Sequence, residues 1–99
     1  MKAAVLPNLD KRGAYDVVLK LGEILKNEEI EAYLPEGMIF AGFKQLPEDE
    51  LYGIADIIIT IGGDGTIIRY AKRAALDNKP VLGLSLIHIS EPTRPRLIS

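Results

Sequence analysis

The chain has 99 residues, a hydrophobic content of 47%, a net charge of -2 and no cysteine. This length allows a single small domain, and the absence of cysteine excludes a disulfide framework and a thiolate metal site. The slightly acidic balance gives no reason to expect nucleic acid as a partner. Neither a signal peptide nor an apolar run of about 20 residues is present, so we expect a cytoplasmic protein with no membrane partner.

The first half of the chain predicts a strand, a helix and a second strand. Residues 2–6 form a short apolar run that Pro7 and Asn8 stop, as at the end of a buried strand. A helical pattern begins near residue 11, and Asp10 is placed to act as its N-cap. Residues 30–34 alternate and end at Pro35, which favours a strand. The apolar stripe of this helix consists of Val17, Val18, Leu21, Ile24 and Leu25.

The second half of the chain again predicts a strand, a helix and a strand, after a stretch with a weaker secondary-structure signal. Residues 36–53 predict a connection, with a short helical turn opened by the acidic residues 48–50. Residues 55–61 are β-branched without alternation, which indicates a central strand buried on both faces. A second helix ends at residues 77–80, and residues 81–83 begin another strand. The stripe of this helix consists of Ile67, Tyr70, Ala71, Ala74 and Ala75.

Strands that alternate with helices predict crossover connections and therefore an α/β fold with a mainly parallel, doubly wound, Rossmann-like sheet. In such sheets the ligand site lies at the carboxyl ends of the strands. Residues 62–66 follow directly after the predicted central strand. We therefore expect the functional site at this turn.

Residues 84–99 interrupt the pattern. Residues 84–94 resemble one reading frame of a common sequencing adapter translated in error, so we expect a native domain over residues 1–83 and a non-native tail. The alternative is a genuine strand over residues 84–89 followed by a proline-rich loop. His88, the only histidine of the chain, lies in this segment and is set aside with it.

The turn Gly62-Gly63-Asp64-Gly65-Thr66 joins a strand to a helix. Unencumbered backbone amides and the positive end of a helix dipole favour a phosphate there. The turn matches neither the Walker A pattern nor the complete G-x-G-x-x-G pattern. A carboxylate beside a phosphate site is unfavourable unless it handles a proton or a metal, so Asp64 is the candidate catalytic residue. The alternative is a purely structural turn in which Asp64 or Thr66 caps the helix.

Arg69 lies one helical turn after this motif and is a candidate ligand contact. Its alternative is a solvated helix face, which it would share with Lys72 and Arg73.

On residues 62–66, Arg69 and residues 79–83, the chain resembles the N-terminal part of a bacterial NAD kinase. The resemblance covers residues 1–83 and implies a sheet of the phosphofructokinase and NAD-kinase type. It also implies phosphoryl transfer to the adenosine ribose 2′-hydroxyl of NAD from ATP, with Mg²⁺, or from polyphosphate. Family members are expected to be homo-oligomers.

The same resemblance implies a role for each matching position. Asp64 would be the proton acceptor, and Asp64, Gly65 and Arg69 would contact NAD. The amides of Gly62 and Gly63 would help to bind phosphate, with Thr66 completing the binding set, and none of these residues is expected to be a dedicated metal ligand. Because a carboxylate is a weak base toward an alcohol, we expect Asp64 mainly to orient the hydroxyl.

The chain departs from the family pattern in two respects. The family requires an Asn-Glu pair downstream of the glycine motif and a following β-rich domain that completes the NAD pocket. Here Asn27-Glu28 lies upstream of the motif and is given no role. We therefore expect an incomplete domain and a 99-residue chain that is inactive alone.

Three other interpretations account for parts of this sequence. Lipid kinases of the diacylglycerol and sphingosine type share the glycine motif, but an acidic pair usually follows it at once, whereas Ile67-Ile68-Arg69-Tyr70 follows here. Phosphofructokinases carry a serine version of the turn and a further N-terminal glycine loop, where this chain has residues 6–10. A non-catalytic nucleotide-binding module remains open.

Overall fold

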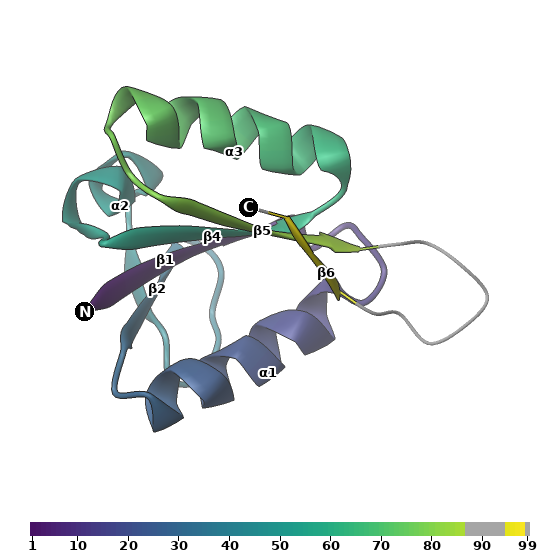
Figure 1. The fold of residues 1–99 in the computed structure, drawn as a ribbon. Helices are drawn as coiled ribbons and strands as arrows, with labels where there is room; N and C mark the ends of the chain where they lie inside the picture. Colours follow the sequence, from purple (N-terminus) through teal and green to yellow (C-terminus); the bar gives the residue numbers. More distant parts are fainter. Residues whose placement is uncertain (87–94, 99) are drawn as a thin grey trace.

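The computed structural model describes residues 1–86 and 95–98. Figure 1 shows a sheet with helices packed on it, in which strands and helices alternate along most of the chain. The elements are β1 (Lys2–Pro7), α1 (Ala14–Asn27), β2 (Glu31–Pro35), β3 (Lys44–Leu46), α2 (Glu48–Ile54), β4 (Ile57–Gly62), α3 (Asp64–Leu76), β5 (Val81–Leu86) and β6 (Pro95–Ile98).

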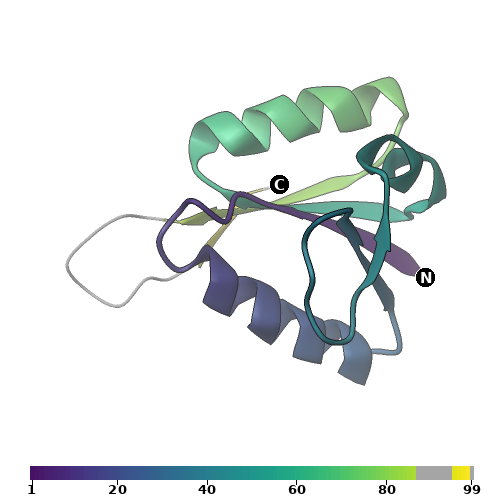
Figure 2. The same ribbon diagram turned by 180° about the vertical axis from the view of Figure 1, so that it is seen from behind.

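The strands lie in the order β3-β2-β1-β4-β5-β6. The first five are parallel, and β6 runs antiparallel to β5. Helix α1 covers one face of the sheet, and α2 and α3 cover the other (Figures 1 and 2). This arrangement confirms the predicted α/β fold with a mainly parallel, doubly wound sheet.

The two central strands, β1 and β4, are buried on both faces. In β1, Ala3 and Val5 belong to the core cluster beneath α1, whereas Ala4 and Leu6 belong to the cluster beneath α2 and α3. In β4, isoleucines likewise divide between the two clusters. Side chains that alternate between two covered faces are mostly apolar, which explains why these strands have no polar alternation. Thr60 of β4 is the exception, since it is fully buried and its hydroxyl has no hydrogen-bond partner among the described residues.

Three strands differ from the sequence prediction, and one of them is β6, which lies in the segment expected to be a tail and pairs with β5. β3 was expected to be part of a connection, because its three residues Lys44, Gln45 and Leu46 carry no apolar pattern. It is held by parallel pairing with β2. β5 continues to Leu86, past the boundary expected at Gly83, and Ser85 pairs with Gly62. His88 and the rest of residues 87–94, with Ser99, lie outside the described residues.

The predicted N-cap of the first helix is wrong. Helix α1 begins at Ala14, after Gly13 in a left-handed conformation (φ 86°), and no side chain caps it. The Asp10 amide instead donates to Asn8 Oδ1 over 3.1 Å, which closes a turn ahead of the helix. Two residues of the predicted apolar stripes are also exposed, since Ile24 is 50% exposed and Ala75 faces solvent.

Arg73 ties α2 to α3, so the solvated helix face that was the alternative for Arg69, Lys72 and Arg73 does not describe this residue. Its guanidinium lies 3.3 Å from Asp49 Oδ1, 3.7 Å from Asp77 Oδ2 and 4.7 Å from the centre of the Tyr52 ring. Tyr52 is 1% exposed, and this burial raises its pKa to about 12. Arg73 is therefore a structural residue at the end of α3 far from the glycine turn.

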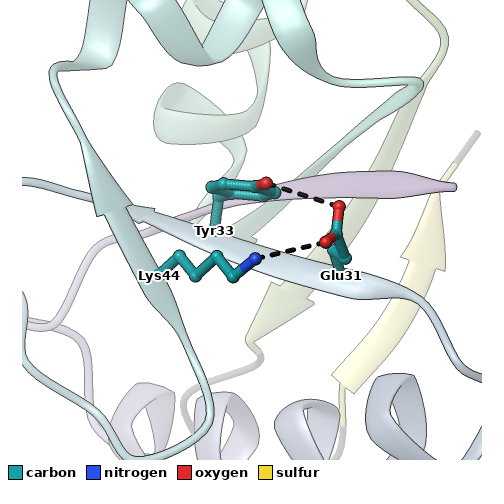
Figure 3. Close-up of polar contacts among 3 residues, drawn as sticks. All are labelled: Glu31, Tyr33 and Lys44. Carbon is teal, nitrogen blue, oxygen red and sulfur yellow. Dashed lines mark hydrogen bonds and ion pairs between the residues drawn. The ribbon is translucent and has the colours of Figure 1, made fainter.

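A second polar cluster lies on β2 and the edge strand β3. Figure 3 shows Glu31 accepting from the Lys44 ammonium over 3.2 Å and from the Tyr33 hydroxyl over 3.4 Å. The hydrogen bond from Lys44 is the main reason why the pKa of Glu31 lies below its usual value. Glu31 is the first residue of β2, so it lies at the amino end of the parallel strands. This cluster is remote from the carboxyl ends where ligands bind.

The strand order reverses between β1 and β4. Helix α1 carries the chain from β1 outward to β2, whereas α3 carries it from β4 in the opposite direction to β5. Neighbouring crossovers that diverge in this way leave a crevice between the carboxyl ends of their strands, where ligands of open α/β sheets bind. Here those ends are Pro7 and Gly62. The topology thus places the glycine turn at the switch point of the sheet.

Candidate functional site

The glycine turn connects β4 to α3 through a single residue. β4 ends at Gly62, α3 begins at Asp64, and Gly63 is the N-cap in an extended conformation (φ -83°, ψ 176°). No side chain forms a capping hydrogen bond, so neither Asp64 nor Thr66 plays the structural role that was the alternative interpretation. The first amides of a helix have no intrahelical acceptor and can bind an anion.

Gly62 is required by close packing. A Cβ atom at this position would lie 3.1 Å from Thr66 Cβ and 3.2 Å from Asn8 Cβ. Contacts this short are tighter than ordinary van der Waals separation, so a side chain would push the turn away from the β1–α1 loop. The absence of a side chain allows three segments to meet at one point.

Asp64 is exposed and lies at the first position of α3. Its Oδ1 atom accepts a hydrogen bond from the Ser85 hydroxyl over 3.2 Å, and Ser85 is 8% exposed on β5. One carboxylate oxygen is therefore oriented by the neighbouring strand. The other oxygen has no hydrogen-bond donor among the described residues, so it can accept a proton or a hydrogen bond from a ligand.

Asn8 fastens the β1–α1 loop to the glycine turn. Its amide donates to the carbonyl of Ile61 over 2.8 Å, and its side-chain Nδ2 donates to Thr66 Oγ1 over 3.3 Å. Its Oδ1 accepts from the Asp10 amide. The side chain of Thr66 is thus occupied by a contact within the protein, while its backbone amide remains part of the first turn of α3.

Arg69 lines a hollow beside the turn rather than the turn itself. Its guanidinium carbon lies 4.9 Å from the centre of the Tyr70 ring, and its side chain is exposed. A cation held against an aromatic ring in this way is partly oriented but remains accessible to a ligand. The hollow lies at the carboxyl end of β1 and is lined by Pro7, Asn8, Leu9, Asp10, Met38, Arg69 and Tyr70.

The described part of the chain contains no group of three or more His, Cys, Asp or Glu side chains able to hold a metal ion. A divalent ion at this site would therefore depend on ligands from a phosphate group as well as from Asp64. Within the same residues, no helix is long and apolar enough to cross a membrane.

The glycine turn at the switch point matches a known family. The family model for the ATP-NAD kinase N-terminal domain matches residues 4–91, which include the whole described site. The chain belongs to this family. The match also includes residues 84–91, which belong to the segment expected to be a non-native tail.

Curated proteins support the same family. NAD kinase from Natranaerobius thermophilus is 32% identical over 85 residues, which cover 83% of this chain and 30% of that protein. NAD kinase from Caldanaerobacter subterraneus subsp. tengcongensis is 31% identical over 91 residues, which cover 89% of this chain and 32% of that protein. NAD kinase from Campylobacter jejuni strain RM1221 is 34% identical over 73 residues (73% and 26%). The chain therefore spans about a third or less of the length of these relatives.

The predicted site residues are only partly brought together. Gly62, Gly63, Asp64, Gly65 and Thr66 form one turn, whereas Arg69 lies beside the adjacent hollow. Sequence reasoning missed Asn8, which it took only as a strand breaker, and Ser85, which it set aside with the tail. The reversal of strand order would have identified Asn8, because residues after β1 must face those after β4.

Proposed function

We propose that this chain is part of an NAD kinase, which transfers a phosphoryl group from ATP or polyphosphate to the adenosine ribose 2′-hydroxyl of NAD. The observation that carries this proposal is Asp64, an exposed carboxylate at the first position of α3 and at the switch point of the sheet. The sequence similarity to named NAD kinases supports the choice of substrates.

In the proposed reaction the turn binds phosphate while Asp64 handles the acceptor. The amides of the first turn of α3, with Gly62 and Gly63 free of side chains, bind phosphate oxygens. Asp64 accepts a hydrogen bond from the ribose hydroxyl and takes its proton as the new O–P bond forms and the bond between the phosphoryl group and its donor breaks. The Ser85 hydroxyl, 3.2 Å from Asp64 Oδ1, leaves the other oxygen for this role. Gly65 and Arg69 provide further NAD contacts.

Mg²⁺ fits this site only together with a phosphate ligand. The described residues supply no cluster of metal ligands, but Mg²⁺ commonly binds one or two carboxylates plus substrate phosphates. The ion would neutralise charge on the transferred group. Asp64 is the one carboxylate of the turn that could reach such an ion.

We also propose that the 99-residue chain is inactive alone, since its Asn-Glu pair lies upstream of the motif, whereas the family resemblance implies a downstream pair. A non-native tail over residues 84–99, a cytoplasmic location and homo-oligomeric assembly belong to the same proposal. Genomic sequence across the junction of residues 83 and 84 tests the tail, because a native coding sequence for residues 84–99 would refute it. NADP formation by the 99-residue chain would refute its proposed inactivity.

The test of function uses a chimera in which residues 1–86, which include Ser85, replace the matching segment of the N. thermophilus NAD kinase. The measured quantity is NADP formation from NAD with ATP or polyphosphate. In the chimera, Asp64→Asn should lower kcat by about 10²- to 10⁴-fold, because the neutral amide neither orients the ribose hydroxyl as a charged acceptor nor takes its proton. The KM values should change by less than about threefold.

The matched control is Asp16→Asn, because Asp16 is the acidic residue in the first turn of α1, away from the glycine turn. This variant should keep normal turnover. Near-normal kcat in Asp64→Asn would refute the catalytic assignment. A folded chimera that binds ATP and NAD saturably but forms no NADP would favour a non-catalytic nucleotide-binding module.

A further inference from the structure

Lys11 lies over the glycine turn. A Cβ atom placed on Gly63 would be 3.2 Å from Lys11 Cε and 3.3 Å from Lys11 Nζ. The end of this lysine therefore occupies the space that a side chain at residue 63 would need. Lys11 comes from the loop between β1 and α1, far from Gly63 in the sequence.

The loop that carries Lys11 is held in place by backbone and side-chain hydrogen bonds. The Lys11 amide donates to the carbonyl of Asn8 over 3.1 Å, and its carbonyl accepts from the Ala14 amide over 3.2 Å. Asn8 in turn donates hydrogen bonds to Ile61 in β4 and to Thr66 in the first turn of α3. The base of the Lys11 side chain is thus fixed relative to Gly63.

The ammonium group of Lys11 has no carboxylate partner among the described residues. The ion pairs there join Lys44 to Glu31 and Arg73 to Asp49 and Asp77. Lys11 is exposed, so its charge is accessible to a ligand. A full positive charge beside the free helix amides adds to the attraction that their partial positive charges exert on an anion.

The two sides of the glycine turn therefore differ in charge. Lys11 approaches Gly63 from the β1 side, whereas Asp64 bonds to Ser85 on the β5 side. An anionic group is attracted to the first side, and a hydroxyl group that must lose a proton is suited to the second.

We propose that Lys11 binds a phosphate group of the phosphoryl donor at the glycine turn. This inference rests on the proposed function and adds a residue that the sequence motif does not contain. Lys11 Nζ donates to phosphate oxygens above Gly63, while Asp64 faces the acceptor hydroxyl. The ligand class is a polyanionic phosphate chain, whether it belongs to a nucleoside triphosphate or to polyphosphate.

The experiment measures ligand binding and turnover in the same chimera, with variants Lys11→Met, Lys11→Arg and Arg12→Met. Arg12 is the matched control, because it is the adjacent exposed cation and has no ion pair among the described residues. Calorimetric titrations use ATP, tripolyphosphate, adenosine and NAD as separate ligands. Tripolyphosphate and adenosine separate recognition of the phosphate chain from recognition of the nucleoside.

Lys11→Met should raise the Kd for ATP and for tripolyphosphate about tenfold, the usual effect of losing a charge-assisted hydrogen bond. The Kd values for adenosine and NAD should stay within about twofold of those of the unaltered chimera. Lys11→Arg should restore most of the phosphate affinity because it keeps the positive charge, and Arg12→Met should change little.

Unchanged binding of both phosphate ligands by Lys11→Met would overturn the inference. An equal loss for all ligands, accompanied by a lower Tm, would also overturn it, since that result indicates a structural role. If the chimera binds phosphate in a Lys11-dependent way yet forms no NADP, the proposed function fails and the inference about Lys11 stands.

Discussion

Two strand-to-helix turns meet at the switch point, and they are built differently. The turn after β4 consists of Gly63 alone, whereas the turn after β1 runs over residues 8–13. The short turn offers backbone amides and one carboxylate at fixed positions. The long turn extends across the gap and brings Asn8 and Lys11 onto its neighbour. The turn after β4 thus provides backbone amides in a fixed position. The turn after β1 provides the side chains that hydrogen-bond to it and place a positive charge beside it.

Gly62→Ala should have the largest effect on this arrangement. Its Cβ would meet the Cβ atoms of Asn8 and Thr66, which cannot move without shifting both turns. We expect the free energy of unfolding of the 99-residue chain to fall by about 1–3 kcal/mol, measured by urea denaturation.

The matched control for this variant is Gly65→Ala in the same motif. A Cβ at Gly65 meets nothing within 4 Å, and alanine is favoured over glycine inside a helix. This change should raise the free energy of unfolding by up to about 1 kcal/mol. Equal destabilisation by both substitutions would show that close packing at Gly62 does not set the turn.

Asn8→Ala tests the fastening between the two turns. It removes the hydrogen bond to Thr66 and the acceptor for the Asp10 amide. The free energy of unfolding should fall by about 1 kcal/mol, with the main-chain bond to Ile61 retained. Asn27→Ala, at the exposed end of α1, should change it by less than about 0.5 kcal/mol. If both variants had the same free energy of unfolding, the side chain of Asn8 would contribute nothing to the contact between the two turns.

Gly63→Ala should have the smallest effect on stability, because its Cβ meets only the flexible end of Lys11. We expect a change below about 0.5 kcal/mol in the free energy of unfolding. Displacement of Lys11 should nevertheless raise the Kd for tripolyphosphate. In a double-mutant cycle with Lys11→Met, the two substitutions should therefore be strongly non-additive. Full additivity would contradict the contact between Lys11 and the turn.

The central architecture could be predicted from the sequence because its signals are local. The apolar runs of β1 and β4, the helical stripes and the glycine motif each occupy a continuous stretch. Features that depend on distant partners could not be predicted in this way. β3 exists through pairing with β2, Asn8 meets Thr66 across 58 residues, and Lys11 reaches Gly63 from another loop.

The errors at helix boundaries have a similar origin. Asp10 has a favourable side chain for capping, but it lies in a turn that Asn8 closes, and the chain continues to Gly13 before α1 begins. Ile24 fits the helical period, yet it lies at an edge of the stripe that the sheet does not reach. Periodicity identifies the apolar face of a helix, but the width of the covered strip depends on the neighbouring strands.

The pairing of β1 with β4 couples ligand binding to folding of the whole domain. Ala3 lies opposite Ile57 and Pro7 opposite Ile61, so both turns take their positions only after distant parts of the chain have joined. A ligand that bridges the turns binds the folded state alone. At a free concentration of 100 times its Kd, it would stabilise the domain by about 2.7 kcal/mol. For a domain this small, binding of such a ligand would contribute a substantial part of the free energy of unfolding.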